Sequence, residues 1–248
     1  MKIYFISIII ILLLVVIFIL PPIPQDLAYH QYADQRALFG IPNFSNVASN
    51  ALFPLIGCAG VWLLFKKRLQ IVAEIDLAYY AFFIGVIFVG GSSMYYHLNP
   101  TNSSLVWDRV GLAIIFVSFF TIIVGEYVSG RLAKLMLTPL LFSSLFSVWY
   151  WNYTESIGSG DLRLYGIVQF LPIILIPSIF LIYKARFSHA YLYWLFIGMY
   201  ILAKIFEIYD VNIGEYFFGF GGHAIKHIIS SGGTVVFLYL LFKRRPKQ

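Results

Sequence analysis

Long apolar segments alternate with short polar connections along this chain. Each segment holds about 18 or more mostly apolar residues, enough for a helix to cross a hydrocarbon core of roughly 30 Å. No run alternates apolar and polar residues with the period of two that membrane strands need. The pattern predicts an all-α polytopic transmembrane bundle with eight helices, at residues 3–20, 46–65, 76–97, 105–127, a fifth that ends near 149–151, and then 164–183, 189–209 and 223–242.

The first apolar segment ends in the run Pro21-Pro22-Ile23-Pro24. Its apolar core is longer than the about 7 to 15 residues of a signal peptide, and no small-residue cleavage site follows. We therefore predict that residues 1–24 form a retained N-terminal transmembrane helix, added to a seven-helix membrane domain at residues 25–248. A cleaved signal peptide is the alternative.

Composition agrees with a membrane protein, because 60% of the residues are hydrophobic and only 11% are charged, against about 25% charged in soluble domains. The net charge of +6 does not predict nucleic-acid binding, since the basic residues lie in short loops and form no clustered face. Cys58 is the single cysteine, so no disulfide forms within the chain. The predicted partner is the lipid bilayer, and the pattern leaves the oligomeric state open.

Basic residues near helix ends predict the orientation, because Lys and Arg stay on the cytoplasmic side. With both termini cytoplasmic, only Arg36, Arg109 and Arg163 fall on the outer side, and Lys204 and Lys226 lie within helices. The others all fall inside: Lys2, Lys66, Lys67, Arg68, Arg131, Lys134, Lys184, Arg186, Lys243, Arg244, Arg245 and Lys247. We therefore expect a multi-pass protein with cytoplasmic N- and C-termini.

Three histidines fall at matching depth near the extracytoplasmic face in this topology. His223 and His227 are one helical turn apart on one face, a spacing that lets two imidazoles share a metal ion. His97 ends an earlier helix at the same level. Three imidazoles and an open position are typical of catalytic zinc, which activates water at neutral pH. The sequence predicts a Zn2+ site, although each histidine alone is also compatible with a structural place at a helix end.

Two further polar residues near His97 suggest hydrolytic chemistry. Asp108 follows at the start of the next helix and is placed to act as general base on water and then as acid to a leaving amine. Ser93, one turn before His97, can direct its hydroxyl at a developing oxyanion. The alternatives are that Asp108 caps its helix or pairs with Arg109, and that Ser93 serves helix packing.

The remaining polar residues in the helices have structural interpretations beside functional ones. Lys204 and Glu207 are spaced for an ion pair within the bundle, which Lys226 can join, and all three are the coupling residues expected of a transporter. Asn46 and Asn50 either support the histidine ligands or bond between helices. His30 and His189 fall in loops on opposite sides, and neither is assigned to a site.

Four motifs in this order resemble the alkaline ceramidase family, part of a wider superfamily of membrane hydrolases and receptors that includes the adiponectin receptors. They are NFSNVASN at 43–50, Ser93-x-x-x-His97, Trp107-Asp108 and His223-x-x-x-His227. The resemblance covers about residue 34 to residue 242, and the runs ADQR, GIPN and WDR look more like the family's bacterial branch. Animal members carry an acidic calcium-binding segment before this region. This chain has only Asp26 and Asp34 there, so calcium is not carried over.

The resemblance implies zinc ligation by His97, His223 and His227 and catalytic roles for Ser93 and Asp108. It implies hydrolysis of the N-acyl amide of ceramide, or of a related lipid, to a fatty acid and a long-chain amine. A non-enzymatic receptor or sensor that binds metal on the same fold is one rival interpretation. A membrane transporter that uses Lys204, Glu207 and Lys226 is another.

Overall fold

The computed structural model describes residues 2–217 and 220–247, with the side chains of residues 2, 3 and 5 left aside. The described chain is all-α, and its only β pairing is two isolated bridges. The α-helices are α1 Lys2–Ile19, α2 Phe44–Ala48, α3 Leu52–Phe65, α4 Asp76–Leu98, α5 Asn102–Tyr127, α6 Gly130–Ser156, α7 Arg163–Ile182, α8 Tyr191–Ile208, α9 Asp210–Tyr216 and α10 Gly222–Lys243. Short 3-10 turns lie at Leu27–His30, Ser49–Ala51 and Ala73–Ile75.

Within the described residues, seven helical spans are long and apolar enough to cross a membrane. Six of them are α4 with its preceding 3-10 turn, α5, α6, α7, α8 and α10, and the seventh joins α2 and α3 over Phe44–Phe65. α1 contributes a shorter apolar helix, Ile6–Ile19, and packs against α7. The chain is therefore a polytopic membrane bundle, as predicted, and the division into an added helix and a seven-helix domain stays a prediction.

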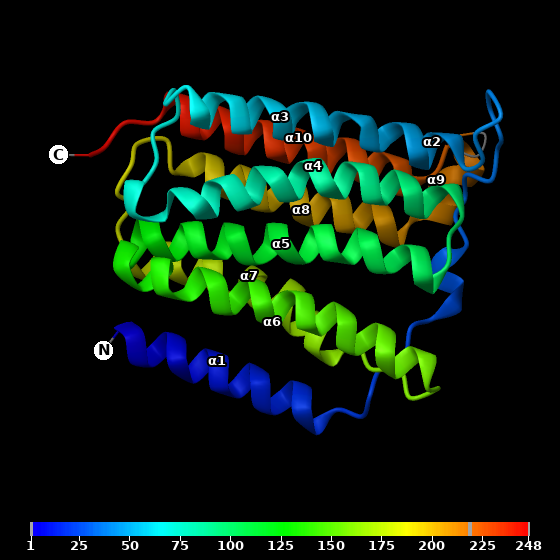
Figure 1. Cartoon of the computed structure of the whole chain (residues 1–248), viewed down its shortest axis with the longest axis horizontal. Coiled ribbons are helices and arrows are strands. Elements are labelled where there is room, and N and C mark those ends of the chain that lie inside the picture. Colours follow the sequence, from blue (N-terminus) through cyan, green and yellow to red (C-terminus); the bar gives the residue numbers. More distant parts are fainter. Residues whose placement is uncertain (1, 218–219, 248) are drawn as a thin grey trace.

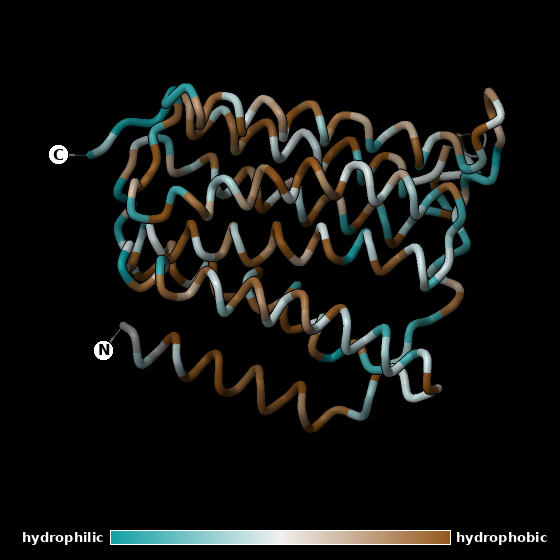
Figure 2. Tube along the Cα trace, viewed as in Figure 1, coloured by the Kyte–Doolittle hydropathy of each residue, from teal (hydrophilic) through white to brown (hydrophobic). Residues whose placement is uncertain are grey.

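Both termini lie at the same end of the bundle (Figure 1). The opposite end collects the last turn of α4 and the first turns of α5 and α10, which carry the predicted site. Apolar residues dominate the helices, and polar residues concentrate in the connections at both ends (Figure 2). Eight crossings were predicted, and seven of them correspond to described spans that are long and apolar enough, whereas the first corresponds to the shorter helix Ile6–Ile19. The eighth crossing and the membrane side on which each end lies stay predictions.

Several helix boundaries differ from the predicted ones. α5 begins at Asn102, earlier than predicted, because Thr101 and Ser104 exchange hydrogen bonds in a capping box. α6 continues past the predicted end to Ser156, and the connection between α8 and α10 contains the short helix α9. The predicted single helix at residues 46–65 starts at Phe44 and is interrupted by the 3-10 turn Ser49–Ala51.

Small residues bring α4 and α5 close together near the site. A Cβ added at Gly111 would lie 2.9 Å from Cα of Val89, so only glycine permits this approach. The aromatic rings of Phe82, Phe119 and Phe237 then interlock edge to face in the centre of the bundle. The close contact of α4 with α5 places the Ser93 turn of α4 beside the Asp108 turn of α5.

A buried ion pair closes the other end of the bundle. Arg244, just after α10, pairs with Glu126 at the end of α5 at 2.7 Å, and neither side chain is more than 1% exposed. The hydroxyls of Tyr79 and Tyr193 donate to the same carboxylate at 2.6 and 2.7 Å. This cluster ties α4, α5, α8 and α10 together at the end that lies away from the histidines.

Candidate metal centre

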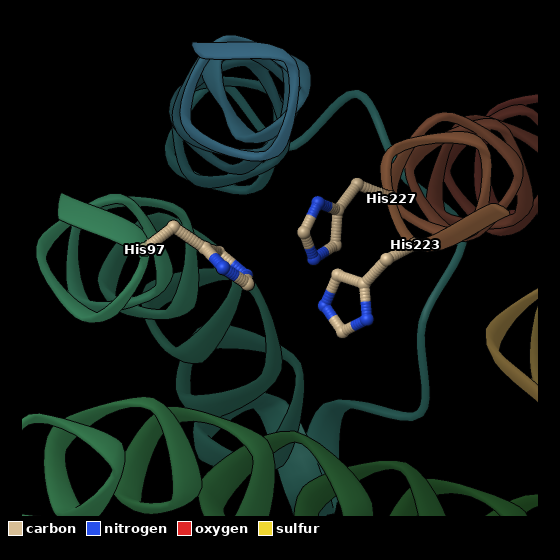
Figure 3. A group of neighbouring side chains, drawn as sticks. All are labelled: His97, His223 and His227. Atoms are coloured by element: carbon tan, nitrogen blue, oxygen red, sulfur yellow. The ribbon is translucent and has the colours of Figure 1, made fainter. Parts of the chain in front are cut away.

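His97, His223 and His227 converge from α4 and α10 onto one buried space, as predicted (Figure 3). One nitrogen from each ring can be chosen so that all three lie within 4.8 Å of one another. The ring centroids are 4.8 to 5.0 Å apart, and the three residues are only 1%, 3% and 5% exposed. Three imidazole donors in a buried pocket fit the ligand set of a zinc ion with an open position.

Polar groups of residues 46–50 surround Nδ1 of His227. The Ser49 hydroxyl donates to the carbonyl of Asn46 and lies 2.9 Å from Nδ1 of His227. Contacts of this kind at Nδ1 orient the ring and leave Nε2 as the nitrogen for a metal ion. The Asn50 amide nitrogen donates to the same Asn46 carbonyl at 2.7 Å and lies 3.1 Å from Nδ1. Of the two predicted supporting residues, Asn50 contacts the ligand by its side chain and Asn46 acts through its backbone carbonyl.

His223 is fixed at the start of α10 by Asp210. One carboxylate oxygen accepts the backbone N–H of His223 at 2.8 Å, and the other accepts that of Ala33 at 2.9 Å. Nζ of Lys226 lies 2.9 Å from Nε2 of His223. Because an ammonium group only donates, Nε2 of His223 is the acceptor in this contact. Lys226 therefore engages the lone pair that Nε2 would offer to a metal ion.

His97 is held at the end of α4 by backbone and ring contacts. The amide of Asn43 donates to its carbonyl at 2.8 Å, and the ring of Tyr32 lies against His97 and His223, with centroids 4.9 and 4.3 Å away. Nδ1 of His97 is buried and has no hydrogen-bond partner in the described residues. Buried polar atoms normally have a partner, and a metal ion would supply one for this nitrogen.

Ser93 and Asp108 lie together beside the histidines. Both are buried, and the Ser93 hydroxyl lies within hydrogen-bonding reach of the Asp108 carboxylate. Asp108 sits well inside α5, whose N-cap is Thr101, so the interpretation of Asp108 as a helix cap is wrong. It also forms no ion pair with Arg109 in the part of the chain described. The carboxylate is left to face the cavity.

A cavity of about 730 Å³ opens beside this group, with walls from α4, α5, α7, α8 and α10. One end of the lining is polar and includes Ser93, Asp108, Lys226 and His227. The rest is mostly apolar, with aromatic and aliphatic side chains such as Phe82, Phe119, Ile176 and Phe196. The volume lies within the usual range for small-molecule sites, and the mixed lining suits a long apolar chain with a polar end.

The predicted ion pair in α8 is confirmed and extends to α10. The Glu207 carboxylate accepts from Lys204 and, through its other oxygen, from Lys226 at 2.9 Å. Tyr29 donates to Glu207 at 3.4 Å. All four side chains line the cavity next to the histidines. A single carboxylate is therefore shared by two ammonium groups at the polar end.

Sequence reasoning missed several residues that support the site. Ser49, Tyr32 and Asp210 hold the histidines, and only Ser49 carried a signal, because it shares a helical face with Asn46. His30 was assigned to no site, but its ring bonds the Tyr96 hydroxyl at 2.9 Å, and that hydroxyl accepts from Tyr32 at 2.6 Å. His189 is exposed and follows Ser188, whose backbone N–H bonds the carbonyl of Arg245 just after α10, so it lies away from the three histidines.

Fold and site together define a multi-pass membrane protein with a buried three-histidine group that can hold a metal ion. Comparisons with family models, with curated proteins and with solved structures find no match to this chain.

Proposed function

We propose that this protein is a zinc-dependent membrane amidohydrolase. It cleaves the N-acyl amide of ceramide, or of a related lipid, to a fatty acid and a long-chain amine, near the extracytoplasmic face. The observation that carries the proposal is the meeting of three buried histidines with Ser93 and Asp108 at the polar end of an otherwise apolar cavity. The motif resemblance to alkaline ceramidases supports the same reaction.

Zinc held by His97, His223 and His227 supplies a Lewis acid that activates water and polarises the amide carbonyl when it is bound. Asp108 accepts a proton from the attacking water and delivers it to the amine nitrogen as the C–N bond breaks. The Ser93 hydroxyl donates a hydrogen bond to the oxygen that becomes negative in the transition state. The water oxygen ends in the fatty acid carboxylate, and the proton ends on the leaving amine.

The apolar part of the cavity accommodates the acyl chain, which enters sideways from the bilayer. α7 packs against α5, α6 and α1, and α8 packs against α10. α7 and α8 meet where Phe180 contacts Tyr193 and Trp194, and both helices also border the cavity. The Gln169 amide of α7 donates to the Tyr200 hydroxyl of α8 at 3.1 Å. A lipid that passes between these two helices places its amide at the polar end of the cavity.

The test is hydrolysis of a fluorescent ceramide by the detergent-purified protein and its Asp108→Asn variant. We expect release of the fatty acid by the wild type and a loss of about 10²-fold or more in kcat for the variant, because the general base is removed. Zinc content of the variant is measured in the same samples and should be unchanged. Asp76→Asn, an exposed change at the far end of α4, is the matched control and should keep full activity.

Failure of this test separates the rival functions. Zinc without hydrolysis of any lipid amide would contradict the enzyme proposal and favour a receptor or sensor. Activity that depends on Lys204, Glu207 and Lys226 but not on Asp108 would favour the transporter, because these three charges would then be the coupling residues.

A further inference from the structure

Arg109 is a buried cation on the cavity wall without an anionic partner. The residue is 7% exposed and follows Asp108 in α5. Its guanidinium stacks on Trp151, with the central carbon 3.9 Å from the ring centroid, and lies 4.9 Å from the centroid of Tyr165. One Nη donates to the neutral side chain of Gln25, and the other Nη has no hydrogen-bond partner in the described residues.

Two carboxylates near Arg109 are engaged elsewhere, and Asp108 forms no ion pair with it in the part of the chain that the structure describes. Glu207 is shared by Lys204 and Lys226. Glu155 accepts from the backbone N–H of Gln25 at 2.6 Å and from the Trp151 ring nitrogen at 3.2 Å. None of these forms an ion pair with Arg109 among the described residues. Charged side chains inside a membrane bundle are costly, and an unpaired one indicates a ligand of opposite charge.

We propose that the lipid amide cleaved at this site carries an anionic group on its amine portion and that Arg109 binds this group. The inference rests on the proposed function and names its substrate class. A guanidinium matches the planar donor pattern of carboxylate and phosphate oxygens. Asp108 and Arg109 both line the cavity, so one lipid that occupies it can present its amide to Asp108 and its anionic group to Arg109.

The two lysines on the cavity wall share a carboxylate, whereas Arg109 has none. Lys204 and Lys226 both pair with Glu207. The lining carries three cations and three carboxylates, since Asp26 and Asp108 also face the cavity. The formal charge of the lining is therefore balanced, and the recognition of an anionic group depends on the unpaired guanidinium of Arg109.

The experiment compares three lipids with one acyl chain: a neutral N-acyl sphingoid base, its 1-phosphate, and an N-acyl amino acid with a free carboxylate. We expect kcat/KM of the wild type to be at least about tenfold higher for one or both anionic lipids. In Arg109→Gln, the ratio of kcat/KM for the anionic lipids to kcat/KM for the neutral lipid should fall close to one. Arg109→Lys should restore part of the preference for the anionic lipids. The matched control is Arg163→Gln, which loses a cation already paired with Asp161 and should leave the ratio unchanged.

The outcomes separate this inference from the proposed function. Equal hydrolysis of neutral and anionic lipids, or a ratio that survives Arg109→Gln, overturns the anionic-substrate inference and leaves the amidohydrolase intact. If no lipid is hydrolysed, binding of the fluorescent N-acyl amino acid and of the fluorescent 1-phosphate decides. Binding of either anionic lipid about tenfold weaker in folded Arg109→Gln than in the wild type supports the anion subsite, and unchanged binding of both overturns it.

Discussion

At the scale of single residues, the histidine site depends on neighbours that hold the ligand rings. Ser49 is the clearest case, because its hydroxyl lies 2.9 Å from Nδ1 of His227. Outer contacts of this kind orient ligands and raise their basicity. The hydroxyl also bonds the Asn46 carbonyl, so the turn Ser49–Ala51 and the ligand are joined in one network.

We predict that Ser49→Ala weakens zinc binding about 10- to 100-fold, because His227 loses the hydroxyl that lies against its Nδ1 and orients the ring. A competition titration against a chelator of known affinity measures the change. Ser143→Ala is the matched control, since Ser143 is exposed in α6 and bonds only its own helix at Pro139. Zinc affinity equal to that of the wild type in Ser49→Ala would show that this hydroxyl does not position the ligand.

Asp34 is a residue-scale anchor in the connection before α2. Its carboxylate accepts the backbone N–H of Ser45 at 2.6 Å and the Arg36 guanidinium at 2.9 Å. Burial raises the pKa of Asp34, but the hydrogen bonds from Arg36 and Ser45 outweigh burial and hold the pKa below its ordinary value. The folded state therefore binds the Asp34 proton less tightly than the unfolded state, whose pKa is about 3.9.

This sign predicts that Asp34 stabilises the fold above about pH 4 and that the contribution is lost as the pH falls through the folded-state value. Asp34→Asn should lower the free energy of unfolding near neutral pH by about 1–3 kcal/mol and flatten the loss of stability in acid. Tm in detergent between neutral pH and about pH 3 records both effects. The control is Asp26→Asn, at the exposed N-cap of a 3-10 turn where asparagine is also a good cap. It should change neither the stability near neutral pH nor the loss of stability in acid.

At the scale of elements, α10 carries two of the three ligands, so its placement decides the site. Gly222 begins the helix where it touches α8, and an added Cβ would lie 2.1 Å from the backbone carbonyl oxygen of Phe206. A backbone oxygen cannot move away by a change of rotamer, as a side-chain atom can. Any larger residue at position 222 must therefore displace the first turn of α10, which holds His223.

We predict that Gly222→Ala reduces zinc affinity by about tenfold or more and destabilises the protein by about 1–3 kcal/mol through overpacking. Zinc titration and Tm are measured on the same preparation. The control is Gly91→Ala in α4, where the added Cβ meets nothing within 4 Å. Gly91→Ala should keep zinc and retain or slightly raise Tm, since alanine favours a helix. Normal zinc affinity in Gly222→Ala would contradict the rigid placement of α10.

At the scale of the whole molecule, the sequence was sufficient to predict a polytopic helical bundle and the grouping of the three histidines. Long apolar segments define helices, and an even number of crossings brings His97, Asp108 and His223 to one end. The loop contacts were not predictable, because Tyr32 and Asp210 act from connections without hydrophobic periodicity. The short helix α9 was missed for the same reason. Nor does periodicity indicate that Glu126 and Arg244 close the opposite end, since they meet only when α5 and α10 pack.

The most direct test of the account is metal content by mass spectrometry on the wild type and on His97→Ala and His223→Ala. We predict about one zinc per chain in the wild type and loss of that zinc in both variants. His189→Ala changes an exposed histidine next to Ser188, which bonds Arg245 just after α10, and should keep the zinc. A folded wild type without metal, or variants that retain the full amount, would contradict the three-histidine zinc site.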